Sequence, residues 1–323
     1  CDEEEAPNES PDDEGNLAPL APQSQAMMTD GCGKRASGLA YCLEGQRAFV
    51  TDPELREVRI LDFSDFDKPQ LLFIDGVAAR IDSFPNGNLN WVPTDIDVWN
   101  PVPGDFAETD TAICCSTMVA VTWMDPALPL DSGLVAIYNS DGVLIDSVHG
   151  VIPTGPGVNA VTFSDDGKWL VTANAGAALG AGVSDDPVGS ITAIDVSSYS
   201  NIIGSTDFSG ISVHQIDFAS LTSVGGLASR LSTDSHVGAY SVAQVLEPTG
   251  LAFDPNHHTV WVNCQRNNAL VEVDLDQIVA GTAVQGAWGW GIRNMQATGG
   301  INATSNDSPA LQPGDNLFGW RQP

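Results

Sequence analysis

The sequence predicts an all-β fold of the β-propeller class. Runs of β-branched, aromatic and aliphatic residues, each about five residues long, recur along the chain, and clusters of Pro, Asn, Asp and Gly separate them. Runs and turns follow the same order in successive segments, so the chain is organised as imperfect repeats of about three or four strands. Such repeats predict blades that stack around an axis, because no blade buries its faces alone. A β-sandwich is the alternative, although it would not produce this serial repetition.

The first repeat follows residue 36. Its four β-type runs are residues 37–41, 47–51, 57–62 and 70–74, and turns separate them. The first run is apolar, and the third alternates between apolar and polar residues. The alternation with period two in the third run indicates a strand that is buried on one face more than on the other.

The second repeat is looser, because an insertion at 100–115 interrupts it. Its predicted strands are residues 94–98, 117–123, 132–138 and 143–148. The sequence Asn139-Ser140-Asp141-Gly142 between the last two is a hairpin signal.

The third repeat is the cleanest, and a fourth follows a long irregular segment. The third contains strands at 158–163, 168–174 and 190–196, with a Gly/Ala-rich loop at 175–189, and the irregular segment 197–244 that follows it contains one short strand at 213–218. The fourth contains strands at 251–253, 259–263 and 269–274. The sequence therefore carries about four blades' worth of repeats.

Residues 1–36 form an acidic, Pro-containing arm that shows no strand alternation. We expect this arm to be extended unless a partner binds it, and we assign residues 37–323 to the propeller. The chain begins with Cys1 followed by acidic residues. A lipid-anchored bacterial surface protein would begin in this way, and the alternative is that the numbering simply starts at this residue.

The net charge of −30, from 42 acidic and 12 basic residues, limits the classes of partner. No basic stripe is available to displace the counterions of nucleic acid or of an anionic membrane. A solvated acidic surface suited to high salt is one explanation of the charge, and metal coordination is the other. No apolar run approaches the roughly 20 residues that a membrane-spanning helix needs.

Cysteines and glycosylation sequons fit a secreted or surface-displayed protein. Cys32 and Cys42 are candidates for a disulfide that closes a short loop between the arm and the first strand, and buried free thiols are the alternative. Glycosylation candidates are Asn8, Asn302 and Asn306, each in an Asn-x-Ser/Thr sequence.

Motifs of the common hydrolases and nucleotide-binding proteins, GxSxG, HExxH and the P-loop, do not occur in the sequence. Carboxylate and amide side chains at strand starts or ends are better candidates for chemistry, because channel residues of a propeller would lie there and hard oxygen ligands suit Ca²⁺. The metal-ligand candidates are Asp95, Asp97, Asn159, Asn174 and Glu247. His257 and His258 lie in a turn between strands, where surface exposure is the default expectation.

Two stretches resemble a known family. LEPTGLAFD at 246–254 and QRNNALVEVD at 265–274 are similar to a blade and to a QENNA strand of the choice-of-anchor I domain, and NAVTFSDDG at 159–167 resembles its preceding repeat. The resemblance implies a secreted or surface-displayed, YncE-like propeller of seven blades, in a family that includes mesenchyme-specific cell surface glycoproteins. Thr249 stands where the family often has an acid. Since four repeats are visible, we expect a carboxy-terminal part or another chain to complete the wheel.

The sequence is compatible with two functions. The first is a non-catalytic extracellular propeller, acting as a structural, adhesion or assembly module that binds other protein chains or glycans. The second is a Ca²⁺-dependent hydrolase of the lactonase or phosphoesterase type that uses carboxylates at the propeller axis.

Overall fold

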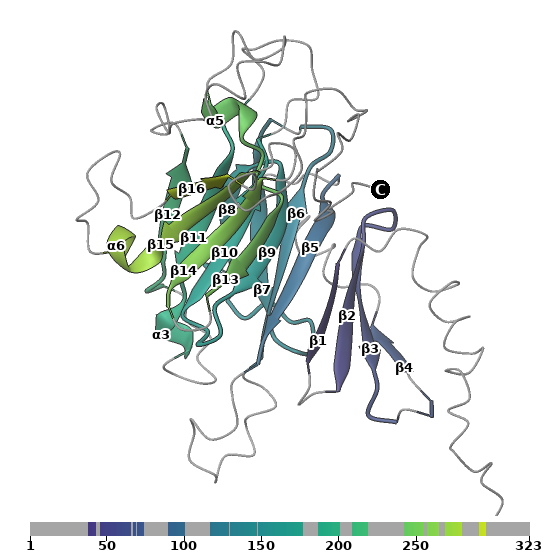
Figure 1. Ribbon diagram of the computed structural model, residues 1–323. Helices are drawn as coiled ribbons and strands as arrows, with labels where there is room; N and C mark the ends of the chain where they lie inside the picture. The colour runs from purple at the N-terminus through teal and green to yellow at the C-terminus, as the bar shows by residue number, and fades with distance from the viewer. Residues whose placement is uncertain are drawn as a thin grey trace, which may run out of the picture.

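Consecutive strands of the chain form antiparallel sheets of four strands each (Figure 1). The computed structural model describes residues 38–42, 46–65, 67–68, 70–73, 90–100, 117–128, 130–146, 148–176, 187–200, 209–218, 242–254, 257–264, 269–279 and 291–294. In every sheet each strand pairs with the next one along the chain, which is the meander expected of a propeller blade.

Blades 1 and 2 come from the first half of the chain. Blade 1 contains β1 (Leu39–Cys42), β2 (Arg47–Asp52), β3 (Glu57–Asp62) and β4 (Gln70–Phe73). Blade 2 contains β5 (Val92–Trp99), β6 (Met118–Met124), β7 (Ser132–Tyr138) and β8 (Val151–Pro156).

Blades 3 and 4 follow in the same order. Blade 3 contains β9 (Val158–Phe163), β10 (Trp169–Asn174), β11 (Ser190–Asp195) and β12 (Ser212–Asp217), with the short helix α3 (Ser197–Ser200) after β11. Blade 4 contains β13 (Gly250–Phe253), β14 (Thr259–Cys264), β15 (Ala269–Asp274) and β16 (Gly291–Asn294). The helices α5 (Val242–Val245) and α6 (Leu275–Val279) precede β13 and follow β15.

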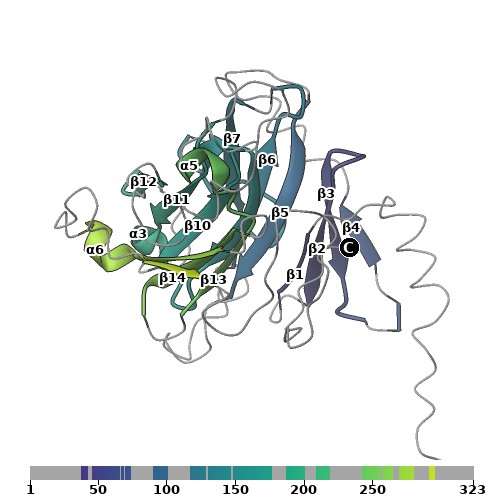
Figure 2. The same cartoon turned by 45° about the horizontal axis from the view of Figure 1, so that its top comes forward.

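The first strands of the blades lie side by side. β5 packs beside β1 and beside β9, and β9 packs beside β13. Figure 2 shows the sheet of β1–β4 standing next to β5, the first strand of the following sheet. Because the first strand of each blade faces the first strand of the next, the sheets turn around a common axis, and the fold is the predicted β-propeller. The expected number of seven blades stays a prediction.

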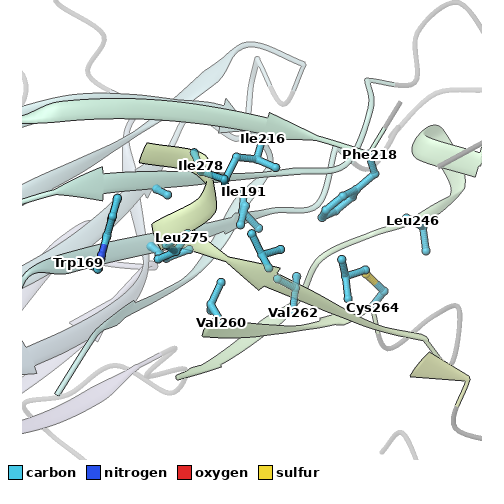
Figure 3. Packing of buried hydrophobic residues seen from close by; sticks show 14 of the residues in the cluster. Trp169, Ile191, Ile216, Phe218, Leu246, Val260, Val262, Cys264, Leu275 and Ile278 are labelled. Carbon is cyan, nitrogen blue, oxygen red and sulfur yellow. The ribbon is translucent and has the colours of Figure 1, made fainter. Parts of the chain in front are cut away.

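Apolar side chains fill the layers between successive blades. The layer between blades 3 and 4 takes Trp169 and Ile191 from one side and Val260 and Val262 from the other, and all of them are buried (Figure 3). Comparable layers join blade 1 to blade 2 and blade 2 to blade 3. Full burial of a side chain of this size contributes about 1.5–3 kcal/mol, so these layers are the main source of cohesion between blades.

One predicted strand is wrong. Residues 143–148 do not form the last strand of blade 2, because the Asp146 carboxylate accepts hydrogen bonds from the backbone N–H groups of Val148 and His149 and so turns the chain. In its described residues, 143–146 and 148, the segment makes an isolated bridge from Leu144 to Tyr138 and forms no strand. The last strand is instead β8, and β16 is a further strand that the sequence pattern did not predict.

Several predictions concern residues outside the described ranges. They are the 1–36 arm, Cys1, the Cys32 half of the Cys32–Cys42 disulfide, and the sequons at Asn8, Asn302 and Asn306. They stay predictions. Within the described ranges, no helix has the length and apolar character needed to cross a membrane.

Candidate functional site

Asp95 and Asp97 form a pair of carboxylates on β5, where residues two apart project from the same face of the strand. Asp95 Oδ2 accepts a hydrogen bond from the backbone N–H of Val161 at 3.0 Å, and Asp97 Oδ2 accepts one from that of Phe163 at 2.8 Å. Both donors belong to β9, whose other edge pairs with β10. The carboxylates therefore supply acceptors to an edge of β9 that no strand of blade 3 covers.

Burial raises the pKa of both carboxyl groups above the usual value of an aspartate, and the bonds from Val161 and Phe163 oppose that shift. The charge of Asp97 raises the pKa of Asp95 further. Two partly buried carboxylates on one face of a strand are harder to ionise than a single exposed one.

Neighbouring strands hold the Asp95 backbone and leave room for its side chain. Thr122 on β6 accepts a hydrogen bond from the Asp95 backbone N–H at 3.1 Å. A Cβ atom on Gly38, next to β1, would stand 2.8 Å from Asp95 Oδ1 and 3.1 Å from the backbone nitrogen of Ile96. Gly38 thus allows the approach of β1 to this part of β5.

Asn174 takes part in a different hydrogen-bond network, inside blade 3. Its buried amide nitrogen donates to Ser190 Oγ at 3.2 Å and to Thr192 Oγ1 at 3.0 Å, and its oxygen accepts from Thr172 at 3.1 Å. Thr192 in turn donates to the side chain of Gln215 at 3.0 Å. This polar row runs across β10, β11 and β12, so the Asn174 side chain connects the strands of its own blade.

The other two metal-ligand candidates lie apart from that network. Asn159 is on β9, two residues before Val161, and its Oδ1 atom is buried without a hydrogen-bond partner among the described residues. Glu247 precedes β13, and its negative charge acts on the Cys264 thiol. The structure therefore brings Asp95 and Asp97 together, with Asn159 on the adjoining strand.

Asp95 and Asp97 by themselves supply only part of a divalent-cation site. Each carboxylate of the pair already accepts a backbone hydrogen bond, and the Asn174 amide is engaged elsewhere. In the part of the chain that the structure describes, no group of three His, Cys, Asp or Glu side chains could hold a metal ion. Ca²⁺ prefers six to eight oxygen ligands, which is more than this pair supplies.

Residues that sequence reasoning did not single out meet at the turn between β9 and β10. Trp99, the last residue of β5, donates from its indole Nε1 to the backbone carbonyl of Asp165 at 3.1 Å. Gly167 lies under the Trp99 ring with φ of +67°, a conformation that a residue with a Cβ rarely adopts. The turn therefore joins blade 3 to blade 2, and the sequence SDDG predicted only that a turn occurs here.

The same turn joins blade 3 to blade 4 through His258. The Nε2 atom of His258 lies 2.9 Å from Asp166 Oδ2, and its Nδ1 atom lies 2.7 Å from Oδ1 of Asp276 in α6. Lys168 Nζ also lies 2.9 Å from Asp166 Oδ2. The expectation of surface exposure is confirmed for His257, whose side chain is 72% exposed, whereas the His258 side chain is partly buried at 26%.

The thiol of Cys264 is buried in the apolar layer between blades 3 and 4. Burial, together with the charge of Glu247, raises the pKa of Cys264 to about 12. Cys42 is also buried, with its Sγ atom 3.4 Å from Thr117 Oγ1 across the layer between blades 1 and 2.

We expect Cys264 to resist alkylation in the folded protein. At about pH 8 its thiolate fraction is about 10³-fold below that of an ordinary thiol, and the layer excludes the reagent. Peptide mapping after iodoacetamide treatment measures the labelling, with a guanidinium-unfolded sample as the control. Labelling of Cys264 in the native protein at the rate seen in the unfolded sample would contradict this burial.

Comparison with known proteins identified one matching family model and several solved structures of low similarity. The family model described as the choice-of-anchor I domain matches residues 39–323. No match was found among curated proteins.

The solved structures that resemble the chain are distant. Hydrazine synthase of Kuenenia stuttgartiensis is 12% identical with a TM-score of 0.39, and the similarity covers 79% of this chain and 69% of the hydrazine synthase chain. A putative 6-phosphogluconolactonase of Bacteroides uniformis is 13% identical with a TM-score of 0.40, over 74% of this chain and 50% of that one. The Dos1 propeller is 9% identical with a TM-score of 0.44, over 74% and 44%. The chain thus spans half or less of the last two, and similarities of this strength do not bear on its activity.

Proposed function

Because the chain belongs to the choice-of-anchor I domain family, we propose that it is a non-catalytic propeller of the cell surface or the extracellular space. In this proposal it acts as a structural, adhesion or assembly module. Its partners are other protein chains, which include further copies of itself or a completing carboxy-terminal part. Glycans are the second class of ligand.

The observation that carries this proposal is the engagement of Asp95 and Asp97 with the backbone of β9. These carboxylates stand where a propeller enzyme would use acidic residues, and here they connect blade 2 to blade 3. An acidic side chain that satisfies a backbone donor is a structural element, and its removal affects the blade junction before any chemistry.

The charge of the chain agrees with a module that works outside the cell. A net charge of −30 keeps the surface hydrated and soluble where salt screens the repulsion between carboxylates. The same charge attracts cations and basic surfaces, so a protein partner of this chain is expected to present positive charge at the contact.

The Ca²⁺-dependent hydrolase is the second candidate. The raised pKa of Asp95 and Asp97 favours it, because a cation bound near the pair would offset the repulsion between the two charges. The residues would first have to exchange their backbone hydrogen bonds for metal ligation.

One set of measurements separates the two candidates. Purified protein is assayed with esterase, lactonase and phosphatase substrates, with and without Ca²⁺, and its mass in solution is measured by light scattering. We expect no turnover in any assay, and a mass above that of one chain.

Ca²⁺-dependent turnover would establish the hydrolase instead, provided that it is lost in the Asp95→Asn/Asp97→Asn variant. Asp65→Asn/Asp67→Asn, which changes two exposed carboxylates of the turn between β3 and β4, is the matched control for general effects of charge. A monomer without turnover would leave the surface location standing but would contradict the assembly role.

A further inference from the structure

The contacts of His258 require two protons on its ring. Nε2 faces the Asp166 carboxylate at 2.9 Å, and Nδ1 faces the Asp276 carboxylate at 2.7 Å. A carboxylate only accepts hydrogen bonds, and a neutral imidazole has a single N–H group. Both contacts can therefore be hydrogen bonds only while the ring is an imidazolium, since a neutral ring would place a lone pair against one carboxylate.

The two carboxylates come from different blades. Asp166 belongs to the β9–β10 turn of blade 3, whereas His258 precedes β14 and Asp276 lies in α6, both in blade 4. A backbone hydrogen bond from Leu275 N to His258 O at 2.9 Å holds α6 against the histidine turn whatever the charge of the ring. Of the two contacts that the His258 ring makes, the one to Asp166 connects the two blades, so protonation acts on a contact between blades.

Other charged groups near His258 are predominantly acidic. The β9–β10 turn contains Asp165 and the Asp166–Lys168 ion pair. In the turn before β14, His257 lies 3.4 Å from Asp254. Asp274, at the end of β15, accepts hydrogen bonds from Gln277. Lys168 adds a positive charge beside Asp166. Burial lowers the pKa of His258, but the bonds and charges of Asp166 and Asp276 outweigh burial and raise it.

We propose that Asp166, His258 and Asp276 form a proton-controlled clip that fastens blade 4 to blade 3 when the ring is charged and releases that contact when the ring is neutral. The clip lies at the end of the blades where the β9–β10 turn also receives Trp99 from blade 2. A change of pH is thus transmitted to a turn shared by three successive blades.

The sign of the pH effect follows from the direction of the pKa shift. The folded-state pKa of His258 lies above the value of 6.5 that an unperturbed histidine has. The clip therefore contributes its full stability below about pH 6.5, and this contribution is lost as the pH rises through the folded-state pKa. The contact between blades 3 and 4 would therefore be stronger in mildly acidic water and weaker in mildly alkaline water.

Two measurements on the whole chain test the clip. Histidine NMR follows the titration of His258, which we expect above the ordinary value and at a lower pH in Asp276→Asn than in the natural sequence. Hydrogen exchange gives the protection factors of β14 amides, corrected for intrinsic exchange. Between about pH 5.5 and about pH 8 we expect protection to fall by about 2- to 5-fold, which matches the strength of partly exposed ion pairs.

The His258→Gln variant should lose this pH dependence, and His257→Gln, which changes a 72% exposed neighbour, should retain it. Asp166→Asn should reduce the pH dependence of β14 protection while leaving the His258–Asp276 contact in place. The clip is refuted if His258 titrates at or below the ordinary value. It is also refuted if His258→Gln and the natural sequence lose protection equally with pH.

Discussion

Replacing Gly167 with alanine is expected to lower the free energy of unfolding by about 3–5 kcal/mol. Gly167 has φ of +67°, and a side chain there is strained by about 1–2 kcal/mol before any contact is considered. A Cβ atom would also overlap the Trp99 ring, so one of the two groups would have to move. Trp99 cannot withdraw easily, because it is 7% exposed and its indole donates to Asp165 O.

Denaturant unfolding followed by circular dichroism measures the effect. Gly210→Ala is the matched control, since a Cβ there would meet its nearest atom, Ser198 Cβ, at 3.5 Å, which is an ordinary contact. We expect that control to change stability by no more than about 0.5 kcal/mol. A smaller ring should recover part of the loss, so Trp99→Phe is combined with Gly167→Ala in a double-mutant cycle. Equal stabilities of the two alanine variants would show that the Trp99 contact does not constrain the turn.

Strands could be predicted where the hydrophobic pattern is local. The run 158–163 coincides with β9, and 213–218 differs from β12 by one residue at each end. β8 was missed because it contains Pro153 and Pro156, which argue against a central strand. β8 is the last strand of its sheet, and an edge strand tolerates proline because its outward N–H group has no partner to lose.

The site could be predicted only in part, because its partners are distant in the sequence. The sequence predicts a strand at 94–98 with Asp95 and Asp97 as metal-ligand candidates, and alternation places the two on one face of that strand. Their acceptor role depends on β9, 66 residues further on, approaching with its free edge. The contact between His258 and Asp166 spans 92 residues and two turns. Only the packing of one blade on the next brings such residues together, and no local pattern encodes that packing.

Replacing both Asp95 and Asp97 with alanine is expected to lower the free energy of unfolding by about 2–5 kcal/mol. The N–H groups of Val161 and Phe163 would lose their acceptors, and each buried donor left without a partner costs about 1–3 kcal/mol. Removal of two partly buried negative charges offsets some of this loss, since burial and mutual repulsion disfavour the ionised pair. The cost of the lost hydrogen bonds exceeds the gain from removing the charges, because the pair is only partly buried and the desolvation of its charges is incomplete.

The Asp95→Asn/Asp97→Asn variant separates the acceptor from the charge. Asparagine keeps a carbonyl oxygen for each N–H group, so we expect the free energy of unfolding of this variant to lie within about 1 kcal/mol of that of the natural sequence.

The pH dependence of stability supplies a second comparison. Because the folded-state pKa of both aspartates is raised, the natural sequence gains stability relative to the asparagine variant as the pH falls through that pKa, and loses it as the pH rises. Denaturant unfolding at about pH 4.5 and about pH 7 measures this difference. If the asparagine and alanine variants were equally destabilised, the negative charge would matter rather than the hydrogen bonds to β9, and a bound cation would become the better explanation of the pair.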